Sequence, residues 1–539
     1  MNSHNLYNQN SISSVRKELK RDQLSLKNRL QSILYDSFFI ASLKDISSEL
    51  AQFPLVPNER CGLWYVPNEK QVESSYFKST DGHTNEWKFS MRRLNFHLLP
   101  LIAKNQGISI IDSTRKGKLM PDALSKTIPI WCAVLNSILY EGVGDEDIRK
   151  EIEDQFGDTK EDVISIVLGL KNENQWLRTP KEMVSRSEHN SIMKRIDGFV
   201  HEVKHLGLID KEQLLSALGG NRKPLIPSWL YPGCKLLTSG QEESFVFEEE
   251  VTDEVKQQPY YSIQCVTASK KTSDGESASI CVRRRLENEE LVSTSWNYVQ
   301  GSADDHELWA TNDICKGELS PKLFWELLSL KDSKNNIVDE ETGYIYDWLS
   351  EEDLVKRMNS LYSEYYSTKE NQRRTLDVSS ISNSSRNTGI ALGKIEADIK
   401  YNDLVRDFPN AAQVIILSDK FKILELPEKE GISIYSYKIE SSKKGSKQLR
   451  EVFPSLVPQL KINPQTKNNL LVLCDTGKDI GAGLVLLLLC MHFGLDWNPT
   501  NETPRIDKDI IKKQLSSLAN IRKVNPSRNT LQSVNTYLM

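Results

Sequence analysis

Two turns of this sequence combine small residues, hydroxyl groups and cations in a way that suits phosphate binding. One lies in IIDSTRKGKLMPDALS, Ile110–Ser125, and the other in LVLCDTGKDIGAG, Leu471–Gly483. In each, an apolar strand pattern precedes the turn and a helix pattern follows it. Backbone N–H groups at a helix N-terminus are unpaired and lie at the positive end of the helix dipole, so they attract anions. A tight turn with solvated lysines is the alternative interpretation of each.

The predicted phosphate contacts are hydroxyls and cations in the first turn, and small residues and a thiol in the second. They are Ser113, Thr114, Arg115, Lys116 and Lys118, and Cys474, Thr476, Gly477 and Gly481. Lys478 adds a catalytic cation to the second turn, where Asp475 and Asp479 are candidate general bases or metal ligands. Neither turn matches a Walker A or a dinucleotide-binding fingerprint.

Cys474 occupies the place of the nucleophile in a phosphatase loop, but the rest of that machinery is incomplete. Phosphatases of this kind need an arginine six residues later, and Ile480 stands there. Because that guanidinium binds two phosphate oxygens and stabilises the transition state, its loss argues against hydrolysis. Cys474 is then either a low-pKa thiol at a helix N-terminus or a small buried side chain.

Adjacent carboxylates follow a predicted strand in YVQGSADDHELWA, Tyr298–Ala310. Asp304 and Asp305 supply the oxygen ligands that Mg²⁺ prefers, so they are a candidate metal site. Acidic residues in an exposed turn are the alternative.

Charge is segregated along a chain whose formal net charge is −5. Arg505–Arg528 holds seven basic residues against two acidic ones, and Arg16–Arg29 holds six against two. Such clusters form basic surfaces even on a mildly acidic protein, although solvated helix faces give the same pattern.

The length of the chain and its strand and helix patterns predict that a multi-domain α/β protein positions these residues. A length of 539 residues fits two to four domains. Strand and helix patterns alternate after a Ser-rich stretch, so we expect a large α/β region at 1–366, a linker at 367–388 and an α/β domain with parallel strands at 389–539. KPLIPSWLYPG, Lys223–Gly233, is Pro-rich and predicts a connector, whereas YYSIQCVTAS and ASICVRRRL predict strands flanking a turn.

The eight cysteines form no CxxC pair, and no apolar run is long enough to span a bilayer. We therefore expect a reduced, soluble, cytoplasmic protein with no membrane partner.

Six segments resemble the fungal and plant initiator-tRNA phosphoribosyl transferases. They are CGLWYVP, SSYFKSTDGHTNEWKFSMRRLNFHLLPLI, DSTRKGKLMPDALSKTIPIWCAVLN, YVQGSADDHELWA, LVLCDTGKDIGAG and NPSRNTLQSVNTYLM, which follow in order along nearly the whole chain. The resemblance implies a glycosyltransferase that moves 5-phosphoribosyl from 5-phosphoribosyl 1-diphosphate to the 2′-hydroxyl of T-stem adenosine 64, so that initiator methionine tRNA is excluded from elongation. It also implies a C-terminal domain similar to dual-specificity phosphatases.

This chemistry gives the predicted residues their roles. The donor has two phosphate ends and the chain has two phosphate-type turns, so each turn is expected to hold phosphate of donor or tRNA, with Mg²⁺ as the expected cofactor. No DNA partner is expected, and the predicted tRNA contacts are Arg16, Lys20, Lys512, Lys513, Arg522 and Arg528. The usual phosphoribosyltransferase signature of two adjacent acids before a Thr-Gly-Thr loop is missing. A phosphatase acting through Cys474 and an RNA-binding protein without chemistry stay open as alternatives.

Overall fold

The computed structural model describes residues 24–46, 53–79, 86–156, 161–172, 176–234, 259–272, 279–285, 291–304, 314–330, 333–370, 376–383, 386–426, 431–500 and 506–539. Of the predicted site residues, Arg16, Lys20 and Asp305 lie outside these ranges.

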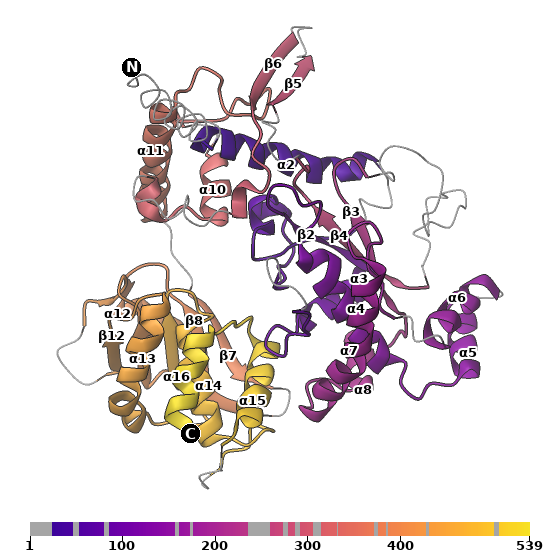
Figure 1. The fold of residues 1–539 in the computed structure, drawn as a ribbon. Coiled ribbons are helices and arrows are strands. Elements are labelled where there is room, and N and C mark those ends of the chain that lie inside the picture. The colour runs from indigo at the N-terminus through magenta and orange to yellow at the C-terminus, as the bar shows by residue number, and fades with distance from the viewer. Residues whose placement is uncertain are drawn as a thin grey trace, which may run out of the picture. The chain divides into compact units, whose positions relative to one another are not determined.

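The chain forms two compact units. The first comprises Met1–Phe89, His97–Val200 and Asp210–Gln372, and the second comprises Ser90–Phe96, His201–Ile209 and Arg373–Met539. Each unit has its own sheet, so each can position its own candidate turn (Figure 1).

The first unit contains a four-stranded sheet of order β1-β2-β4-β3, in which every neighbouring pair is parallel. Its strands are β1 (Leu55–Pro57), β2 (Gly107–Asp112), β3 (Leu225–Leu230) and β4 (Tyr261–Thr267). Every residue of β2 and β4 is buried, as expected for central strands covered on both faces. The carboxyl ends of β2 and β4 therefore meet at one edge of the sheet.

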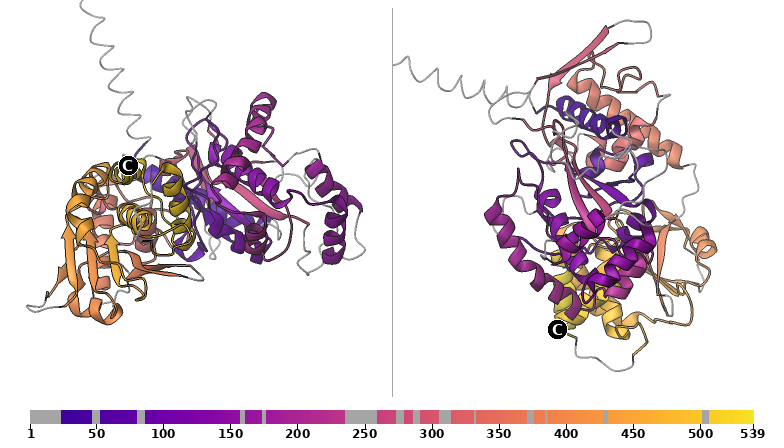
Figure 2. Two further views of the ribbon diagram at one scale, coloured as in Figure 1. Left: turned by 90° about the horizontal axis from the view of Figure 1, so that it is seen from below. Right: turned by 90° about the vertical axis from the view of Figure 1, so that its right-hand side faces the viewer.

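Helices and an antiparallel hairpin complete the first unit. The helices are α2 (Leu26–Ile46), α3 (Leu99–Asn105), α4 (Ile128–Leu139), α5 (Asp145–Phe156), α6 (Glu161–Asn172), α7 (Arg186–His205), α8 (Lys211–Ala217), α10 (Pro321–Leu328) and α11 (Glu351–Glu370), with 3₁₀ turns at Gly62–Trp64, Asn68–Lys70, Phe96–Leu98, Ser302–Asp304 and Cys315–Gly317. The last residues of α7, from His201, and Phe96 are assigned to the second unit. The hairpin pairs β5 (Ser279–Arg285) with β6 (Leu291–Asn297) and projects from the unit (Figures 1 and 2).

The second unit contains a five-stranded sheet of order β12-β10-β13-β8-β7. Its strands are β7 (Asp377–Ser382), β8 (Asn387–Lys394), β10 (Gln413–Leu417), β12 (Ser433–Tyr437) and β13 (Leu470–Cys474), and only the β7–β8 pair is antiparallel. A separate parallel pair joins β9 (Ile399–Lys400) to β11 (Ile423–Leu424). The central strand β13 delivers Cys474 to the carboxyl edge of the sheet.

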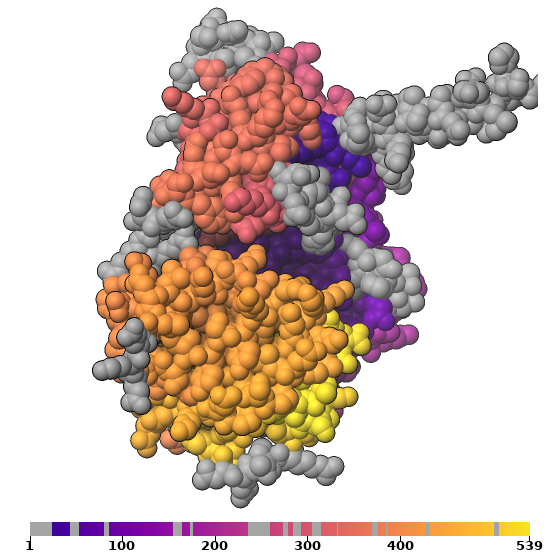
Figure 3. All heavy atoms as spheres, turned by 90° about the vertical axis from the view of Figure 1, so that its left-hand side faces the viewer, coloured from indigo at the N-terminus to yellow at the C-terminus, as the bar shows by residue number. Residues whose placement is uncertain are grey.

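Helices cover the second sheet mainly on one face. These are α13 (Lys443–Leu456), α14 (Ile480–His492), α15 (Lys508–Ile521) and α16 (Arg528–Leu538), while α12 (Tyr401–Asp407) belongs to the hydrophobic core of the other face (Figure 1). A 3₁₀ turn, Val457–Gln459, follows α13. The helix predicted after the second turn is confirmed as α14, in which Ile480 to Cys490 are all buried. The unit packs as one continuous body in the space-filling view (Figure 3).

Three details differ from the expected organisation. The expected linker 367–388 contains the end of α11 and the strand β7, which is in the sheet because it pairs with β8 and buries Ile381. The expected Pro-rich connector forms β3, where Pro227 is tolerated on an edge strand. The strands β4 and β5 do not pair with each other, since β4 lies between β2 and β3.

Among the placed residues, no helix combines the length and apolar character needed to cross a membrane.

Candidate functional site

The first turn leaves the sheet at the end of β2 and leads into a continuous helical stretch. Residues Ala123–Thr127 form a π-helical segment before α4, and Pro129 lies in the first turn of α4. Proline lacks the N–H that an α-helical bond to the preceding turn would need, so a helical start at this point suits it. Wider π turns often occur at functional sites. The strand–turn–helix arrangement predicted from the sequence is confirmed.

The predicted phosphate contacts of this turn divide into buried hydroxyls and exposed cations. Ser113 and Thr114 are completely buried, whereas Arg115 and Lys116 are exposed. Lys118 is half-buried and its Nζ lies 3.5 Å from Asp122 Oδ1. The turn thus presents its charges outward while its first two side chains point into the unit.

Backbone contacts fix the shape of the turn. The Gln300 side chain accepts a hydrogen bond from the Gly117 N–H and donates one to the Lys118 carbonyl. The Thr114 N–H donates to Ser269 Oγ at 3.3 Å. Gly301 approaches so closely that a Cβ there would lie 2.4 Å from the Thr114 carbonyl oxygen. The turn is therefore held from two sides by loops of the same unit.

Asp112, the last residue of β2, is a buried carboxylate that sequence reasoning missed. Its Oδ2 accepts a hydrogen bond from Asn58 Nδ2 at 2.9 Å, and its Oδ1 accepts one from the Ser113 N–H at 2.9 Å. Burial raises the pKa of Asp112 to about 6, although the charge of Arg60 acts in the opposite direction. A carboxyl group with a pKa near neutrality suits proton transfer. The signal in the sequence was an acid at the end of a largely apolar strand, ISIID.

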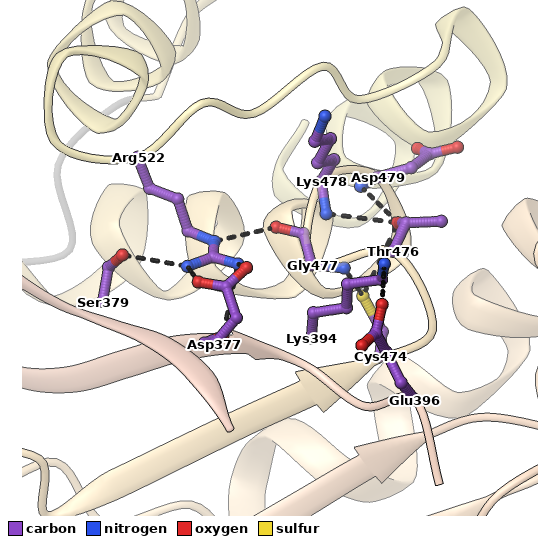
Figure 4. Close-up of polar contacts among 10 residues, drawn as sticks. All are labelled: Asp377, Ser379, Lys394, Glu396, Cys474, Thr476, Gly477, Lys478, Asp479 and Arg522. Atoms are coloured by element: carbon purple, nitrogen blue, oxygen red, sulfur yellow. Dashed lines mark hydrogen bonds and ion pairs between the residues drawn. The ribbon is translucent and has the colours of Figure 1, made fainter. Parts of the chain in front are cut away.

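In the second turn the thiol of Cys474 is a hydrogen-bond acceptor inside the protein. The Gly477 N–H points at its sulfur at 3.2 Å (Figure 4), and the Gly481 N–H does so at 3.3 Å. These bonds lower the pKa of the thiol, but burial outweighs them and raises its pKa overall. Of the two interpretations of Cys474, the structure favours a small buried side chain over an activated nucleophile.

The hydroxyl of Thr476 accepts two further N–H groups of this turn. Lys478 N–H donates to it at 3.2 Å and Asp479 N–H at 3.3 Å. Four backbone donors of the predicted phosphate loop are thus already bonded within the turn. Phosphate binding by Cys474, Thr476, Gly477 and Gly481 stays a prediction, and it requires the anion to displace these contacts.

The two acids of the second turn have different surroundings. Asp479 Oδ1 accepts from the Ser527 N–H at 2.8 Å and from Thr530 Oγ1 at 2.6 Å, so it holds the start of α16. Asp475 Oδ2 accepts from Ser441 Oγ at 2.9 Å. Its Oδ1 is buried and, among the described residues, has no hydrogen-bond partner. Asp475 is the better candidate for a proton acceptor.

Arg522 does not have the surface role that the sequence predicted. Its guanidinium is buried, and all five N–H groups donate within the second unit (Figure 4). Nε donates to the Gly477 carbonyl at 3.2 Å, and the two Nη atoms form a bidentate ion pair with Asp377 at 3.1 Å and 2.8 Å. This pair holds the pKa of Asp377 below its usual range. Arg522 therefore fixes the turn, and its contact with tRNA phosphates stays a prediction that would require these hydrogen bonds to be given up.

The remaining predicted cations lie at the surface. Lys478 extends away from Cys474 (Figure 4). Lys512 and Lys513 are partly exposed on α15, and Arg528 is exposed at the start of α16. Contacts of Lys512, Lys513 and Arg528 with tRNA stay predictions.

The expected metal site has no support from the described residues. Asp304 ends a 3₁₀ turn, while its neighbour Asp305 falls outside the described ranges. Within those ranges, no three histidine, cysteine or acidic side chains group together as metal ligands would. No residue is therefore assigned to Mg²⁺.

Comparison with known proteins covers nearly the whole chain. Residues 19–351 match the family described as the Rit1 N-terminal domain, and residues 433–538 match the Rit1 DUSP-like domain. The second match confirms the phosphatase-like C-terminal domain expected from the sequence.

Curated relatives agree with these matches. A Saccharomyces cerevisiae protein named tRNA A64-2′-O-ribosylphosphate transferase is 35% identical, covering 98% of this chain and 95% of that protein. An uncharacterized Schizosaccharomyces pombe protein is 30% identical, covering 95% and 94%. The Yvh1 phosphatase domain of Chaetomium thermophilum covers 28% of this chain and 90% of that domain at 12% identity, with a TM-score of 0.21. The family match over residues 19–351 and the identity to the Saccharomyces cerevisiae protein show that this chain belongs to the Rit1 family.

Proposed function

We propose that this protein transfers the 5-phosphoribosyl group of 5-phosphoribosyl 1-diphosphate to the 2′-hydroxyl of T-stem adenosine 64 of initiator methionine tRNA. The proposal rests on the Saccharomyces cerevisiae relative named tRNA A64-2′-O-ribosylphosphate transferase, which is 35% identical over 98% of this chain. The modified tRNA is then excluded from elongation. All eight cysteines are free thiols, which is consistent with a reaction in the reducing cytoplasm.

The transfer breaks the bond between carbon 1 of the donor and pyrophosphate, and it forms a bond from carbon 1 to the ribose 2′-oxygen. The 2′-hydroxyl gives up its proton, so a nearby carboxylate must accept it. In the second turn we assign this role to Asp475, because its Oδ1 has no protein partner within the described part of the chain. Asp479 is a poorer choice because its Oδ1 already accepts two hydrogen bonds.

Cations are expected to neutralise the phosphate groups of donor and tRNA. Arg115 and Lys116 are exposed in the first turn, and Lys478 is a candidate in the second. Mg²⁺ belongs to the proposal because it would neutralise the leaving pyrophosphate. Loss of transfer after chelation, restored by added Mg²⁺, is the expected result.

Contacts to tRNA would come from the partly exposed Lys512 and Lys513 and from Arg528. Such cations bind backbone phosphates and fix position, while an A-form stem is recognised by shape and by its 2′-hydroxyls. We expect affinity for tRNA to fall steeply between low and physiological salt. An affinity that does not change with salt would argue against this surface.

The direct test is incorporation of label from the radiolabelled donor into initiator tRNA. A matched control tRNA carries a 2′-O-methyl group at adenosine 64, which blocks the acceptor and should abolish labelling. Binding of tRNA without labelling would support a binding protein without chemistry. Release of phosphate from an aryl phosphate, lost in Cys474→Ser, would support a phosphatase instead.

Asp475→Asn tests the proton acceptor. The substitution retains the shape of the side chain but removes its basicity, so the rate of transfer should fall about 100-fold or more. Binding of tRNA should be unchanged. A wild-type rate in Asp475→Asn would remove this residue from the mechanism.

A further inference from the structure

Buried polar atoms without partners gather at one place in the first unit. Within the described ranges, seven buried side-chain atoms have no hydrogen-bond partner. Five of these atoms belong to the strand-end cluster, which we define as Asp36, Tyr65, Ser113, Thr114 and Thr267. An unpaired buried polar atom destabilises a fold, so a concentration of them calls for a ligand or ordered water.

The members of the strand-end cluster are joined through the carboxyl ends of β2 and β4. Thr267 ends β4 and is the register partner of Asp112. The Ser269 hydroxyl and the Thr114 backbone exchange two hydrogen bonds, each 3.3 Å long. These contacts bring Thr114 and Thr267 to the same edge of the sheet.

Hydrogen bonding and proximity also link Asp36 and Tyr65 to the rest of the cluster. The Tyr298 hydroxyl donates to Asp36 Oδ1 at 2.7 Å, while Asp36 Oδ2 has no partner among the placed residues. Ser113 and Asp36 are both close enough to the Tyr65 hydroxyl to influence its pKa. Neither the Tyr65 nor the Ser113 hydroxyl makes a hydrogen bond of normal geometry with another described residue.

The chemistry of the cluster fits a sugar better than a bare anion. Carboxylates repel phosphate but accept hydrogen bonds from hydroxyl groups, and serine, threonine and tyrosine hydroxyls both donate and accept. Cations follow directly along the chain, because Arg115 and Lys116 are the next residues and both are exposed. A ligand that matches both parts has several hydroxyls next to one phosphate.

We propose that the strand-end cluster and Asp112 bind the ribose hydroxyls of the donor, and that Arg115 and Lys116 bind its 5-phosphate. The ligand class is therefore a pentose phosphate, and ribose 5-phosphate contains both groups. This inference rests on the proposed function. Carboxyl ends of parallel strands are where α/β proteins commonly bind ligands, which places the proposed site in a favourable position.

The first test measures binding of ribose 5-phosphate to the full chain by calorimetry. Ser113→Ala and Thr267→Val each remove one hydroxyl that lacks a protein partner in the described structure. We expect each to weaken binding about tenfold, the effect of one lost hydrogen bond. Ser109→Ala is the matched control, because the Ser109 hydroxyl is buried in β2, the strand that leads to Ser113, but is bonded to Gln264 Oε1 at 2.7 Å. It should leave the affinity unchanged.

Thermal stability distinguishes a ligand contact from a structural one. Ser113→Ala and Thr267→Val should not lower the melting temperature of the ligand-free protein, since no hydrogen bond is lost. Ser109→Ala should lower it. The opposite pattern would mean that the cluster hydroxyls are paired within the fold.

A second test changes the ligand instead of the protein. Wild-type protein should bind 2-deoxyribose 5-phosphate more weakly than ribose 5-phosphate, and this preference should shrink in at least one of the two cluster variants. Undetectable binding of ribose 5-phosphate to wild type, or equal affinities in wild type, Ser113→Ala and Thr267→Val, would overturn the inference. Labelling of tRNA by the wild type in that case would leave the proposed function standing. Binding that depends on the cluster without any labelling would overturn the function and retain the site.

Discussion

Replacement of Asp112 by asparagine should change how the stability of the first unit depends on pH. Asp112 is completely buried, and its pKa is raised from the ordinary 3.8 to about 6 by that burial. Asparagine has nearly the same shape but carries no charge. It also loses one hydrogen bond, because a carboxylate oxygen that accepts from Asn58 or Ser113 is replaced by an NH₂ group.

The direction of this pH dependence follows from how many protons the folded and unfolded states bind. Since the folded pKa lies above the unfolded value, the folded state binds more protons between pH 3.8 and about 6. The free energy of unfolding therefore falls as pH rises through this window and is level above it. Each pKa unit corresponds to about 1.36 kcal/mol. Ionisation of Asp112 therefore lowers the free energy of unfolding by about 3 kcal/mol at pH 8 and by about 1.6 kcal/mol at pH 5, relative to low pH.

The asparagine variant lacks this dependence. Its lost hydrogen bond lowers stability by the same amount at both pH values and cancels in the comparison. Relative to wild type, Asp112→Asn should therefore be more stable at pH 8 than at pH 5 by about 1.4 kcal/mol, a tenfold change in the folding equilibrium.

Urea unfolding followed by tryptophan fluorescence measures this difference. Nine of the ten tryptophans belong to the first unit, and Trp497 belongs to the second. Asp353→Asn is the control, because hydrogen bonding from Ser350 lowers the pKa of that exposed carboxyl, so it does not titrate between pH 5 and pH 8. Parallel stability curves for wild type and Asp112→Asn from pH 5 to pH 8 would refute the reasoning.

Three further outcomes concern the second turn. Arg522→Ala should accelerate hydrogen exchange in β13 and α14 about 30-fold, as expected when about 2 kcal/mol of charged hydrogen bonds is lost; unchanged exchange would contradict the role of this side chain. Gly477→Ala should lower the melting temperature more than Gly142→Ala. Both glycines have positive φ, but only at Gly477 would an added Cβ lie 2.7 Å from Arg522 Nη2. Equal melting temperatures would show that the turn can shift to make room for the Cβ. Cys474 should react with iodoacetamide more slowly than the exposed Cys281, as peptide mapping can measure, and faster labelling would mean that the buried thiol is activated.

Local patterns in the sequence predicted the strands that are buried on both faces. These are β10 and β13, in which every residue is buried, and their parallel pairing is confirmed. The two strand–turn–helix junctions were also located correctly, since each depends on residues close together in the chain. Two edge strands were missed: β7 is mostly serine with one buried isoleucine, and β3 contains Pro227.

Long-range contacts explain the remaining differences. Arg522 lies within a basic stretch of sequence, but its partner Asp377 is 145 residues away, so the ion pair left no local signal. The strand-end cluster draws residues from α2, β4, the turn that follows β2 and the end of the 3₁₀ turn Gly62–Trp64. Only Ser113 and Thr114 of this cluster were predicted, because they alone lie in a turn with a recognisable pattern.

The hydroxyl of Thr476 has a consequence for how the second turn would meet an anion. It already satisfies two N–H groups, so the turn is preassembled without any ligand. An incoming phosphate would meet a turn that is already ordered. It would have to compete for these N–H groups with the Thr476 hydroxyl, which is part of the chain and always present. Removing that competitor, as in a threonine-to-alanine change at this position, should strengthen anion binding even though it deletes a polar group.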